Sequence, residues 1–596
     1  MKHPSSLCDV TKVLVSTALG KEKADLVVRN SKLVNVYTRE LLEGIDVAVK
    51  GDRIALVGNA AHTIGPNTAV VDATGKYLAP GFLDGHVHVE SSMLTIAQFA
   101  RIVLPRGTTG VFIDPHEIAN VLGLDGVRMM LEESRGLPLR VFVCVPSCVP
   151  ATSPEFETAG AEISPKEIEG ALGWEGVVAL GEMMNYPGVL AGDERMHLEI
   201  RAALKAGKVV EGHSNGLLDE ELAAYTAAGI TSCHESTREI EGLQRARLGM
   251  WVMVREGSAW RDLADVIRAY TARGIDGRRF VLVSDDRHPE DLLREGHVDH
   301  ILRRAVKEGI DPLAAIQMVT LNTAEHFGLD GDLGGIAPGK LADMVLLSSL
   351  REFSVDVVIA GGRVVAKEGK LIVDLPRFRY PERARKTMNV RGRLTPRDLI
   401  VRAPLERGKV KARVIGVSEG KATTRHLVEE LEAIEGEVLP SVEKDIAKVA
   451  VVERHKATGN VGLGFVKGFG LERGAVASTV AHDSHNLLAM GMDDSDMAFA
   501  ANKLIEVGGG MIAVSGGKIL ALVELPIAGL MSEGDAERVS EEVAALKEAW
   551  AKLGCEMTSP FMTMSLLALP VLPELRITDK GLVDTVEFRR LSTLVE

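Results

Sequence analysis

The chain has 596 residues, of which 46% are hydrophobic and 26% are charged, proportions that are typical of a globular protein with several domains. A formal net charge of -14 argues against a nucleic-acid partner, because phosphate binding needs clustered Lys and Arg. Residues 1–6 have no apolar signal core, and no apolar run approaches the ~18 residues of a membrane span. We therefore expect a cytoplasmic protein without a membrane partner.

The cysteines support this expectation. Cys8, Cys144, Cys148, Cys233 and Cys555 are an odd and scattered set without a CxxC pair. We expect them to be free thiols in a reducing compartment.

Short β-rich runs separated by turn residues fill residues 26–57, and the same texture returns over residues 344–365. Gly361 and Gly362 predict a two-residue hairpin turn within the second stretch. We predict one split β domain, formed by residues 1–79 and 338–375 and interrupted by a large insertion.

The insertion alternates β-rich runs with helical patterns. The β-rich runs lie at residues 78–89, 108–115, 139–146, 177–184, 208–214, 229–235, 250–255 and 280–286. Amphipathic spacing predicts helices at residues 93–104, 198–206, 220–228 and 261–273. Eight strand-helix units in about 250 residues are typical of a (β/α)8 barrel. We predict an α/β fold with such a barrel at residues 80–337.

An Arg-rich stretch after residue 376 leads into a third region. We predict an additional α/β-type domain at residues 376–596. Its expected strands lie at residues 413–417, 446–453, 462–468 and 519–525, and its expected helices at residues 423–435 and 535–553.

His86 and His88 end the first β-rich run of the predicted barrel. In a strand, residues i and i+2 point to the same face, so the two imidazoles can meet at one point. Alone, this pair is weak evidence for a metal, because histidines are often hydrogen-bonded core or surface residues. The residues at the other strand ends distinguish a metal site from ordinary hydrogen-bonded histidines.

Further candidate ligands end other predicted strands. Active sites of such barrels lie at the C-terminal ends of the strands. The candidates there are His86, His88, Glu182, His213, His234 and Asp285. This set exceeds what one tetrahedral ion uses, whereas two ions about 3.5–4 Å apart need such ligands and a bridging carboxylate. We predict a dinuclear hydrolytic site.

Three sequence motifs carry a family resemblance. Residues 80–88, which read Pro-Gly-Phe-Leu-Asp-Gly-His-Val-His, are similar to the strand-one motif of the amidohydrolase superfamily. Residues 320–326 and 334–344 resemble its barrel-exit motif. The resemblance implies a metal-dependent hydrolase barrel and implies that the split β domain is its companion β-sandwich.

One residue differs from the usual pattern of the superfamily and points to a narrower family within it. Many members of the superfamily bridge their metals with a carboxylated lysine, but the strand-four position here is Glu182. The chain resembles the bacterial adenine deaminase family in this glutamate and in four motifs, at residues 87–92, 114–120, 284–286 and 481–486. The resemblance covers nearly the whole length, including the third domain.

The resemblance implies that a hydroxide bridging two divalent ions hydrolyses adenine to hypoxanthine and ammonia in purine salvage. It implies His86, His88 and Asp285 for one ion and His213 and His234 for the other, with Glu182 between them. Asp285 would also move the proton to the leaving amine. The family favours Mn or Fe(II), while Zn also suits the ligands. A homo-oligomer, with a dimer favoured, is expected.

Two further groups have open roles. Glu90, Ser91, Ser92, His116, Glu117 and Glu235 lie just beyond strand ends, where they either contact the purine or support the metal ligands. His482, Asp483 and His485 form an additional metal site, a lid contact to the barrel mouth, or a loop hydrogen-bond network.

Other functions stay open at this point. A cyclic-amide or N-acyl hydrolase of the same superfamily would use the same kind of site. A non-catalytic binding protein with a metal-stabilised barrel is the alternative from another class. Deaminases that use HxE with PCxxC around one zinc are excluded, because the chain has no PCxxC.

Overall fold

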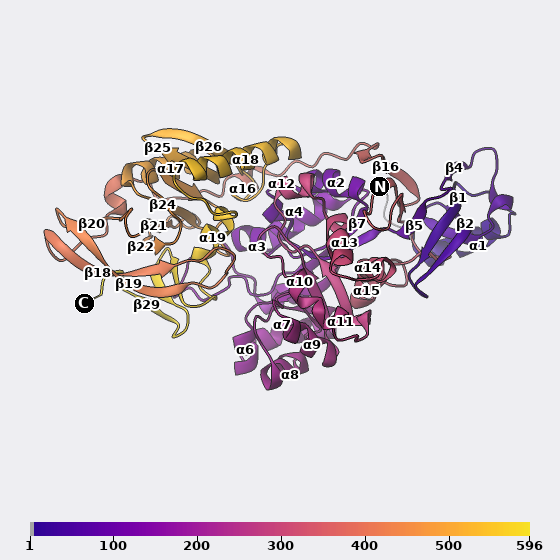
Figure 1. Ribbon diagram of the computed structural model, residues 1–596, viewed down its shortest axis with the longest axis horizontal. Coiled ribbons are helices and arrows are strands. Elements are labelled where there is room, and N and C mark those ends of the chain that lie inside the picture. The colour runs from indigo at the N-terminus through magenta and orange to yellow at the C-terminus, as the bar shows by residue number, and fades with distance from the viewer. Residues whose placement is uncertain (1–4, 596) are drawn as a thin grey trace.

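The computed structural model describes residues 5–595, so residues 1–4, to which the expectation about a signal core partly refers, lie outside the described residues. Three parts follow one another along the long axis of the molecule: an N-terminal sheet, a central barrel and a C-terminal part (Figure 1). Within residues 5–595, no helix is both long enough and apolar enough to cross a membrane.

The N-terminal sheet combines two distant segments of the chain. Its strands are β1 (Leu26–Asn35), β2 (Glu40–Lys50), β3 (Arg53–Gly58), β4 (Ala69–Asp72), β5 (Tyr77–Pro80), β14 (Met344–Leu347), β15 (Val355–Ala360), β16 (Arg363–Lys367) and β17 (Lys370–Leu371), preceded by helix α1 (Leu7–Ala18). They form one nine-stranded sheet in which β5 pairs antiparallel with β14. Gly361 and Gly362 both have positive φ, which the tight turn between β15 and β16 requires.

The barrel has eight parallel strands, and each overlaps one predicted β-rich run. They are β6 (Phe82–Val87), β7 (Thr108–Ile113), β8 (Arg140–Val145), β9 (Val177–Met183), β10 (Val209–Gly212), β11 (Ser232–Cys233), β12 (Trp251–Arg255) and β13 (Phe280–Val283). Strands β6 to β10 form one sheet and β11 to β13 another. A parallel bridge between Val87 and Asp285 joins the first strand to the end of the last. The predicted fold class is thus confirmed.

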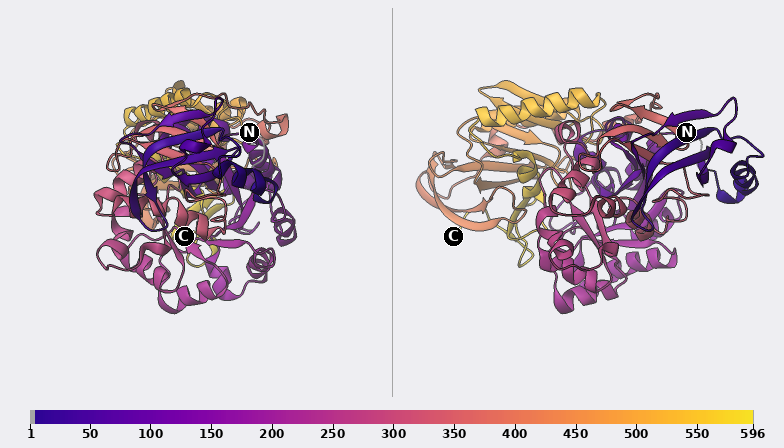
Figure 2. Two further views of the ribbon diagram at one scale, coloured as in Figure 1. Left: turned by 90° about the vertical axis from the view of Figure 1, so that its right-hand side faces the viewer. Right: turned by 45° about the vertical axis from the view of Figure 1, so that its right-hand side comes forward.

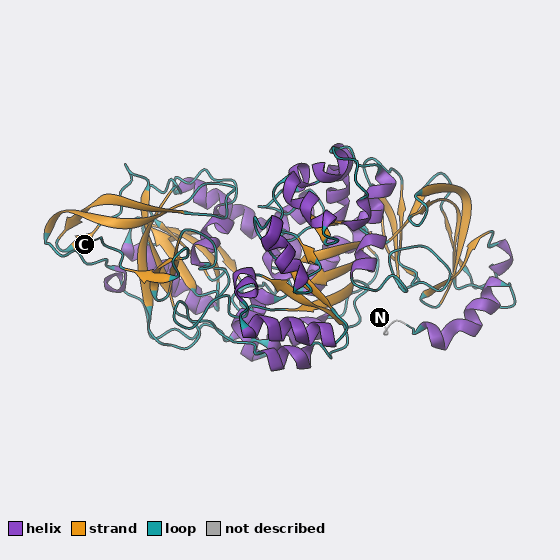
Figure 3. Cartoon of the chain, turned by 90° about the horizontal axis from the view of Figure 1, so that it is seen from below, coloured by secondary structure: helices purple, strands orange, loops and turns teal. Residues whose placement is uncertain are grey.

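Helices surround these strands, as Figure 3 shows in the middle of the molecule. They are α2 (Ile96–Val103), α3 (His116–Leu122), α4 (Leu124–Ser134), α5 (Pro165–Ala171), α6 (Tyr186–Ala191), α7 (Glu194–Lys205), α8 (Asp219–Ala227), α9 (Glu239–Arg247), α10 (Leu263–Val266), α11 (Arg268–Thr271), α12 (Pro289–Arg294), α13 (Val298–Lys307), α14 (Pro312–Met318) and α15 (Leu321–His326). Helix α13 shows why they form: Val298, Ile301, Leu302 and Ala305 recur at helical spacing and are all buried.

The C-terminal part is a second nine-stranded sheet with helices. Its strands are β18 (Arg407–Gly416), β19 (Arg425–Ile434), β20 (Glu437–Val438), β21 (Ile446–Val452), β22 (Val461–Lys467), β23 (Ala475–Ser478), β24 (Leu487–Gly491), β25 (Gly510–Ser515) and β26 (Lys518–Glu524). Its helices are α16 (Glu382–Arg385), α17 (Asp494–Val507), α18 (Ala536–Lys552) and α19 (Pro560–Ser565). Strands β27 (Leu575–Thr578), β28 (Gly581–Asp584) and β29 (Arg589–Leu591) form a small separate sheet.

One prediction in this part is wrong. Residues 423–435 were expected to be helical, but β19 pairs antiparallel with β18 from Arg407 opposite Ile434 to Gly416 opposite Arg425. Leu431 and Ala433 are buried, while Glu430 and Glu432 are exposed, which is the two-residue period of a strand. The Glu- and Leu-rich composition favours a helix, but this long pairing overrides that weak propensity.

The C-terminal part packs against the barrel through polar contacts. Ser532 donates from its backbone N–H to the carbonyl of Met93, at 2.8 Å. Asp579 accepts from the amide and hydroxyl of Thr158, at 2.9 and 2.7 Å. Figure 2 shows the barrel between the N-terminal sheet and the C-terminal part. These contacts bring the loop at residues 481–486 against the barrel.

Glu199 on α7 gives the fold a predictable pH dependence. Burial raises the pKa of Glu199 from 4.5 to about 7, although Arg195 opposes the rise. Since the folded state then binds a proton that the unfolded state has lost, stability falls as pH rises from about 4.5 to about 7, by on the order of 3 kcal/mol. We expect Glu199→Gln to remove this fall, as measured by urea unfolding at pH 5 and pH 7.5. Equal pH dependence in both proteins would contradict the raised pKa.

Candidate metal centre

The structure brings all six predicted ligands together at one end of the barrel. His86 lies on β6, and His88 is the first residue after the end of that strand. Their Nε2 atoms face each other at 3.1 Å. The His86 ring also stacks on the His234 ring, with centroids 4.0 Å apart. The strand periodicity that predicted converging imidazoles therefore describes the observed geometry.

Glu182, near the end of β9, lies at the centre of the cluster. Its Oε2 atom is 2.5 Å from Nδ1 of His213 and 2.9 Å from Nε2 of His234. Its Oε1 atom is 3.7 Å from Nε2 of His88. One carboxylate thus faces histidines from both proposed ligand groups, as a bridging carboxylate would.

Asp285 follows β13 and closes the cluster. Its Oδ1 atom is 3.2 Å from Nε2 of His88 and 3.7 Å from Nε2 of His86. Its backbone N–H donates to the carbonyl of His86 at 3.0 Å, which fixes the ends of β6 and β13 to each other.

Asp114 supports two of these residues, a role that the sequence did not reveal. Its carbonyl is 2.9 Å from Nδ1 of His88, which places the proton on Nδ1 and leaves the Nε2 lone pair facing the cluster. Its Oδ2 accepts from the amide of Glu182 at 2.8 Å. A Cβ at position 181 would lie 2.3 Å from that oxygen, so Gly181 has to lack a side chain.

Arg255, at the end of β12, is the second residue that sequence reasoning missed. Its side chain is buried, and its guanidinium lies 3.1 Å from Oδ2 of Asp285 and 2.6 Å from Oδ2 of Asp262, and also contacts Glu235. Burial would raise the pKa of Asp285, but the neighbouring His88 and the charge of Arg255 lower it. A lone Arg ending the apolar run Trp251–Arg255 is the one signal in the sequence that pointed to this position.

We expect Arg255→Lys to weaken activity by about 10–100-fold, because lysine keeps the charge but cannot contact two carboxylates with one planar fork. The comparison of kcat and KM with wild type checks this role. Arg278→Lys, on an exposed side chain, is the control. Unchanged kcat in Arg255→Lys would contradict a positioning role.

The six residues predicted to contact the purine or support the ligands are distributed around the cluster. Ser91 donates to Asp286 at 2.5 Å, and Ser92 donates to the Val89 carbonyl at 2.5 Å within its own turn. Glu90 accepts from the amide of Ile118 at 3.2 Å. His116 places Nδ1 3.1 Å from Oε1 of Glu182. The remaining two, Glu117 and Glu235, contact His482 and Arg255 respectively.

The C-terminal motif reaches the barrel mouth. Nδ1 of His482 is 2.9 Å from Oε1 of Glu117, and Nε2 of His485 contacts the other oxygen of that carboxylate. Asn486 donates to the carbonyl of Thr158 at 2.8 Å. The loop at 481–486 therefore covers the side of the cluster formed by α3.

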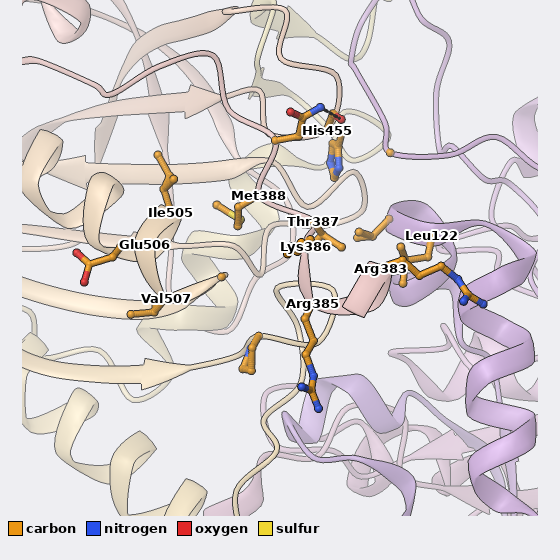
Figure 4. Close-up of a pocket in the computed structure, with 15 residues that line it drawn as sticks. Leu122, Arg383, Arg385, Lys386, Thr387, Met388, His455, Ile505, Glu506 and Val507 are labelled. Atoms are coloured by element: carbon orange, nitrogen blue, oxygen red, sulfur yellow. Dashed lines mark hydrogen bonds between the residues drawn. The ribbon is translucent and has the colours of Figure 1, made fainter. Parts of the chain in front are cut away.

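A cavity of about 740 Å³ lies elsewhere, between the barrel and the C-terminal part (Figure 4). Its cations are paired: Lys386 with Glu382 at 2.5 Å, Arg383 with Asp125 at 3.6 Å, and Arg385 with Glu533. Arg383 and Arg385 point in different directions in Figure 4. The predicted ligands do not line this cavity, so the candidate centre is the buried cluster instead.

The cluster has the chemistry of a divalent metal centre. Several groups of three donors lie within 4.8 Å of one another: His86, His234 and Asp285; His86, His88 and Glu182; and Glu182, His213 and His234. Burial and the neighbouring His234 and His88 hold the pKa of His86 well below its ordinary value, whereas neighbouring carboxylates raise the pKa of His88, His213 and His234, which would release protons when cations bind. The residues present therefore fit a pair of cations.

The chain is similar to known proteins over nearly its whole length. The family model described as "Amidohydrolase family" matches residues 77–365, and that described as "Adenine deaminase C-terminal domain" matches residues 421–589. The chain is 55% identical to an adenine deaminase of Moorella thermoacetica, over 99% of this chain and 98% of that protein. It is 51% identical to an adenine deaminase of Clostridium botulinum, over 99% and 98%.

Proposed function

The chain belongs to the adenine deaminase family of the amidohydrolases, and from this premise we propose that its buried cluster hydrolyses adenine to hypoxanthine and ammonia. The observation that carries the proposal is the position of Glu182 between histidines from three strand ends, His88, His213 and His234. The relatives at 55% and 51% identity are adenine deaminases by name, which supports adenine as the substrate.

We propose that the cluster holds two divalent cations. His86, His88 and Asp285 would hold one, and His213 and His234 would hold the other, with Glu182 between the two groups. Bound cations lower the pKa of water from 15.7 toward ~7 and so supply a nucleophile at neutral pH. The mixed His and carboxylate donors suit Mn, Fe(II) and Zn, and the family favours Mn or Fe(II).

Asp285 accepts and donates the proton that the reaction transfers. This carboxylate is ionised at neutral pH, and from its position beside His86 and His88 it can accept the proton of the attacking water. It then returns that proton to the amine nitrogen on C6, because an amide anion cannot leave. The new C6–O bond and the broken C6–N bond give hypoxanthine and ammonia. Arg255 holds Asp285 in place from the side opposite His88.

Purine contacts would come from side chains at the mouth of the cluster. Glu90 and Glu235 are buried there, and Ser91 is half-buried. The hydroxyl of Ser92 is used within its own turn, so this residue supports the loop that follows His88. The homodimer and the cytoplasmic location remain predictions.

Ammonia release with adenine, adenosine and cyclic amides tests this function, using protein loaded separately with Mn, Fe(II) and Zn. We expect ammonia from adenine and none from cyclic amides. Opening of a cyclic amide without ammonia from adenine would identify the rival hydrolase. Metal-dependent thermal stability without any turnover would identify a binding protein.

A further inference from the structure

A second group of buried metal-ligating side chains lies where helix α3 meets the C-terminal loop. His116 and Glu117 come from α3, and His482 and Asp483 come from the loop at residues 481–486. All four are at most 7% exposed. One donor atom from each lies within 4.8 Å of the others. The proposed reaction does not use this group.

The donor atoms lie close enough together to share one cation. Oε1 of Glu117 is 3.3 Å from Nε2 of His116 and 2.9 Å from Nδ1 of His482. Nδ1 of His482 is 3.7 Å from Oδ1 of Asp483. Ligands on a tetrahedral cation with bonds of 2.0–2.2 Å lie about 3.3–3.6 Å apart. We propose that His116, Glu117, His482 and Asp483 bind a third divalent cation.

Neighbouring hydrogen bonds orient these donors. Nδ1 of His485 accepts from the amide of Ala481 at 3.1 Å, so its proton lies on Nε2 and is donated to Oε2 of Glu117. Oε1 of Glu117 is thereby left for the cation. Such a histidine behind a carboxylate is the arrangement that fixes metal ligands in proteins.

His116 connects the third cation to the dinuclear centre. Its Nδ1 lies 3.1 Å from Oε1 of Glu182, and its Nε2 lies 3.3 Å from Oε1 of Glu117. One imidazole therefore lies between a ligand of the dinuclear centre and a ligand of the third site.

Asp483 shows why a cation is needed here. This carboxylate is 2% exposed, and its Oδ2 has no hydrogen-bond partner within residues 5–595. A buried carboxylate with an unpaired oxygen is costly, and a cation bound to that carboxylate lowers the cost.

The donor set indicates the kind of metal and its role. Two imidazoles and two carboxylates suit Zn²⁺ and similar borderline cations. Four protein ligands fill a tetrahedral shell and leave no position for substrate, so the third cation is structural. Since two ligands come from the barrel and two from the loop, it fastens the C-terminal part over the catalytic centre.

Metal content tests the proposal independently of turnover. Full-length protein is stripped with chelator, saturated with Zn²⁺, dialysed and analysed by elemental analysis. We expect three equivalents in wild type and two in Asp483→Asn. The matched control is Asp579→Asn, another buried carboxylate at the same junction whose partners are Thr158 and Asn460, and it keeps three. His482→Gln, also expected to hold two, replaces Asp483→Asn if that variant does not fold.

The thermal midpoint gives a second readout. Zn²⁺ should raise the midpoint of the stripped wild type and of Asp579→Asn more than that of Asp483→Asn. A saturated wild type with two equivalents or fewer, or an unchanged content in Asp483→Asn, overturns the third site and makes the group an ion-pair contact only. Loss of adenine turnover with three equivalents present would contradict the proposed function and leave the third site standing.

Discussion

Replacing Asp285 by asparagine is expected to lower kcat with adenine by roughly 10²–10⁴-fold while the protein keeps its metal. The asparagine oxygen can still face His86 and His88, but the amide cannot accept the proton of the attacking water. The charge contact with Arg255, at 3.1 Å in the wild type, is also weakened. Steady-state kinetics and elemental analysis on the same preparation measure both effects.

A second variant separates the loss of proton acceptance from the weakened contact with Arg255. Asp262→Asn removes another carboxylate that contacts Arg255, at 2.6 Å, without touching the ligands. We expect it to lose much less activity than Asp285→Asn. Equal losses in the two variants, or normal turnover in Asp285→Asn, would remove Asp285 from the proton transfer.

Replacing Glu182 by glutamine is expected to remove metal and activity together. Glutamine offers one neutral oxygen where the carboxylate places two charged ones, and those two face His88, His213 and His234. We expect loss of at least one of the two cations of the dinuclear centre and a fall in activity of at least about 100-fold. The measurement is metal content after saturation, followed by ammonia release.

Glu199→Gln is the matched control, because Glu199 is also a buried glutamate of the barrel but lies on α7, away from the ligands. It should keep full metal content and activity at neutral pH. Full metal occupancy in Glu182→Gln would mean that Glu182 does not bridge the cations.

The sequence predicted well what depends on local pattern. Runs of buried apolar residues alternating with amphipathic helices predicted all eight barrel strands. Because parallel strands end on one face, histidines and carboxylates at those ends were expected to converge, and His86, His88, Glu182, His213, His234 and Asp285 do.

Long-range pairing was beyond these patterns. The helical composition of residues 423–435 was misleading, because β18 supplies a partner for every residue of β19. The local signal there is a propensity of tenths of a kcal/mol per residue, which a full strand partner outweighs.

By itself, then, the sequence determined the barrel and the identity of its candidate ligands, since strand periodicity and parallel topology are encoded locally. Only the tertiary structure decided which groups support them. Arg255 meets Asp285 across 30 residues, and His485 meets Glu117 across 368. Such contacts depend on how whole elements pack, and the spacing of residues along the chain does not predict them. The buried group joining α3 to the C-terminal loop exists for the same reason.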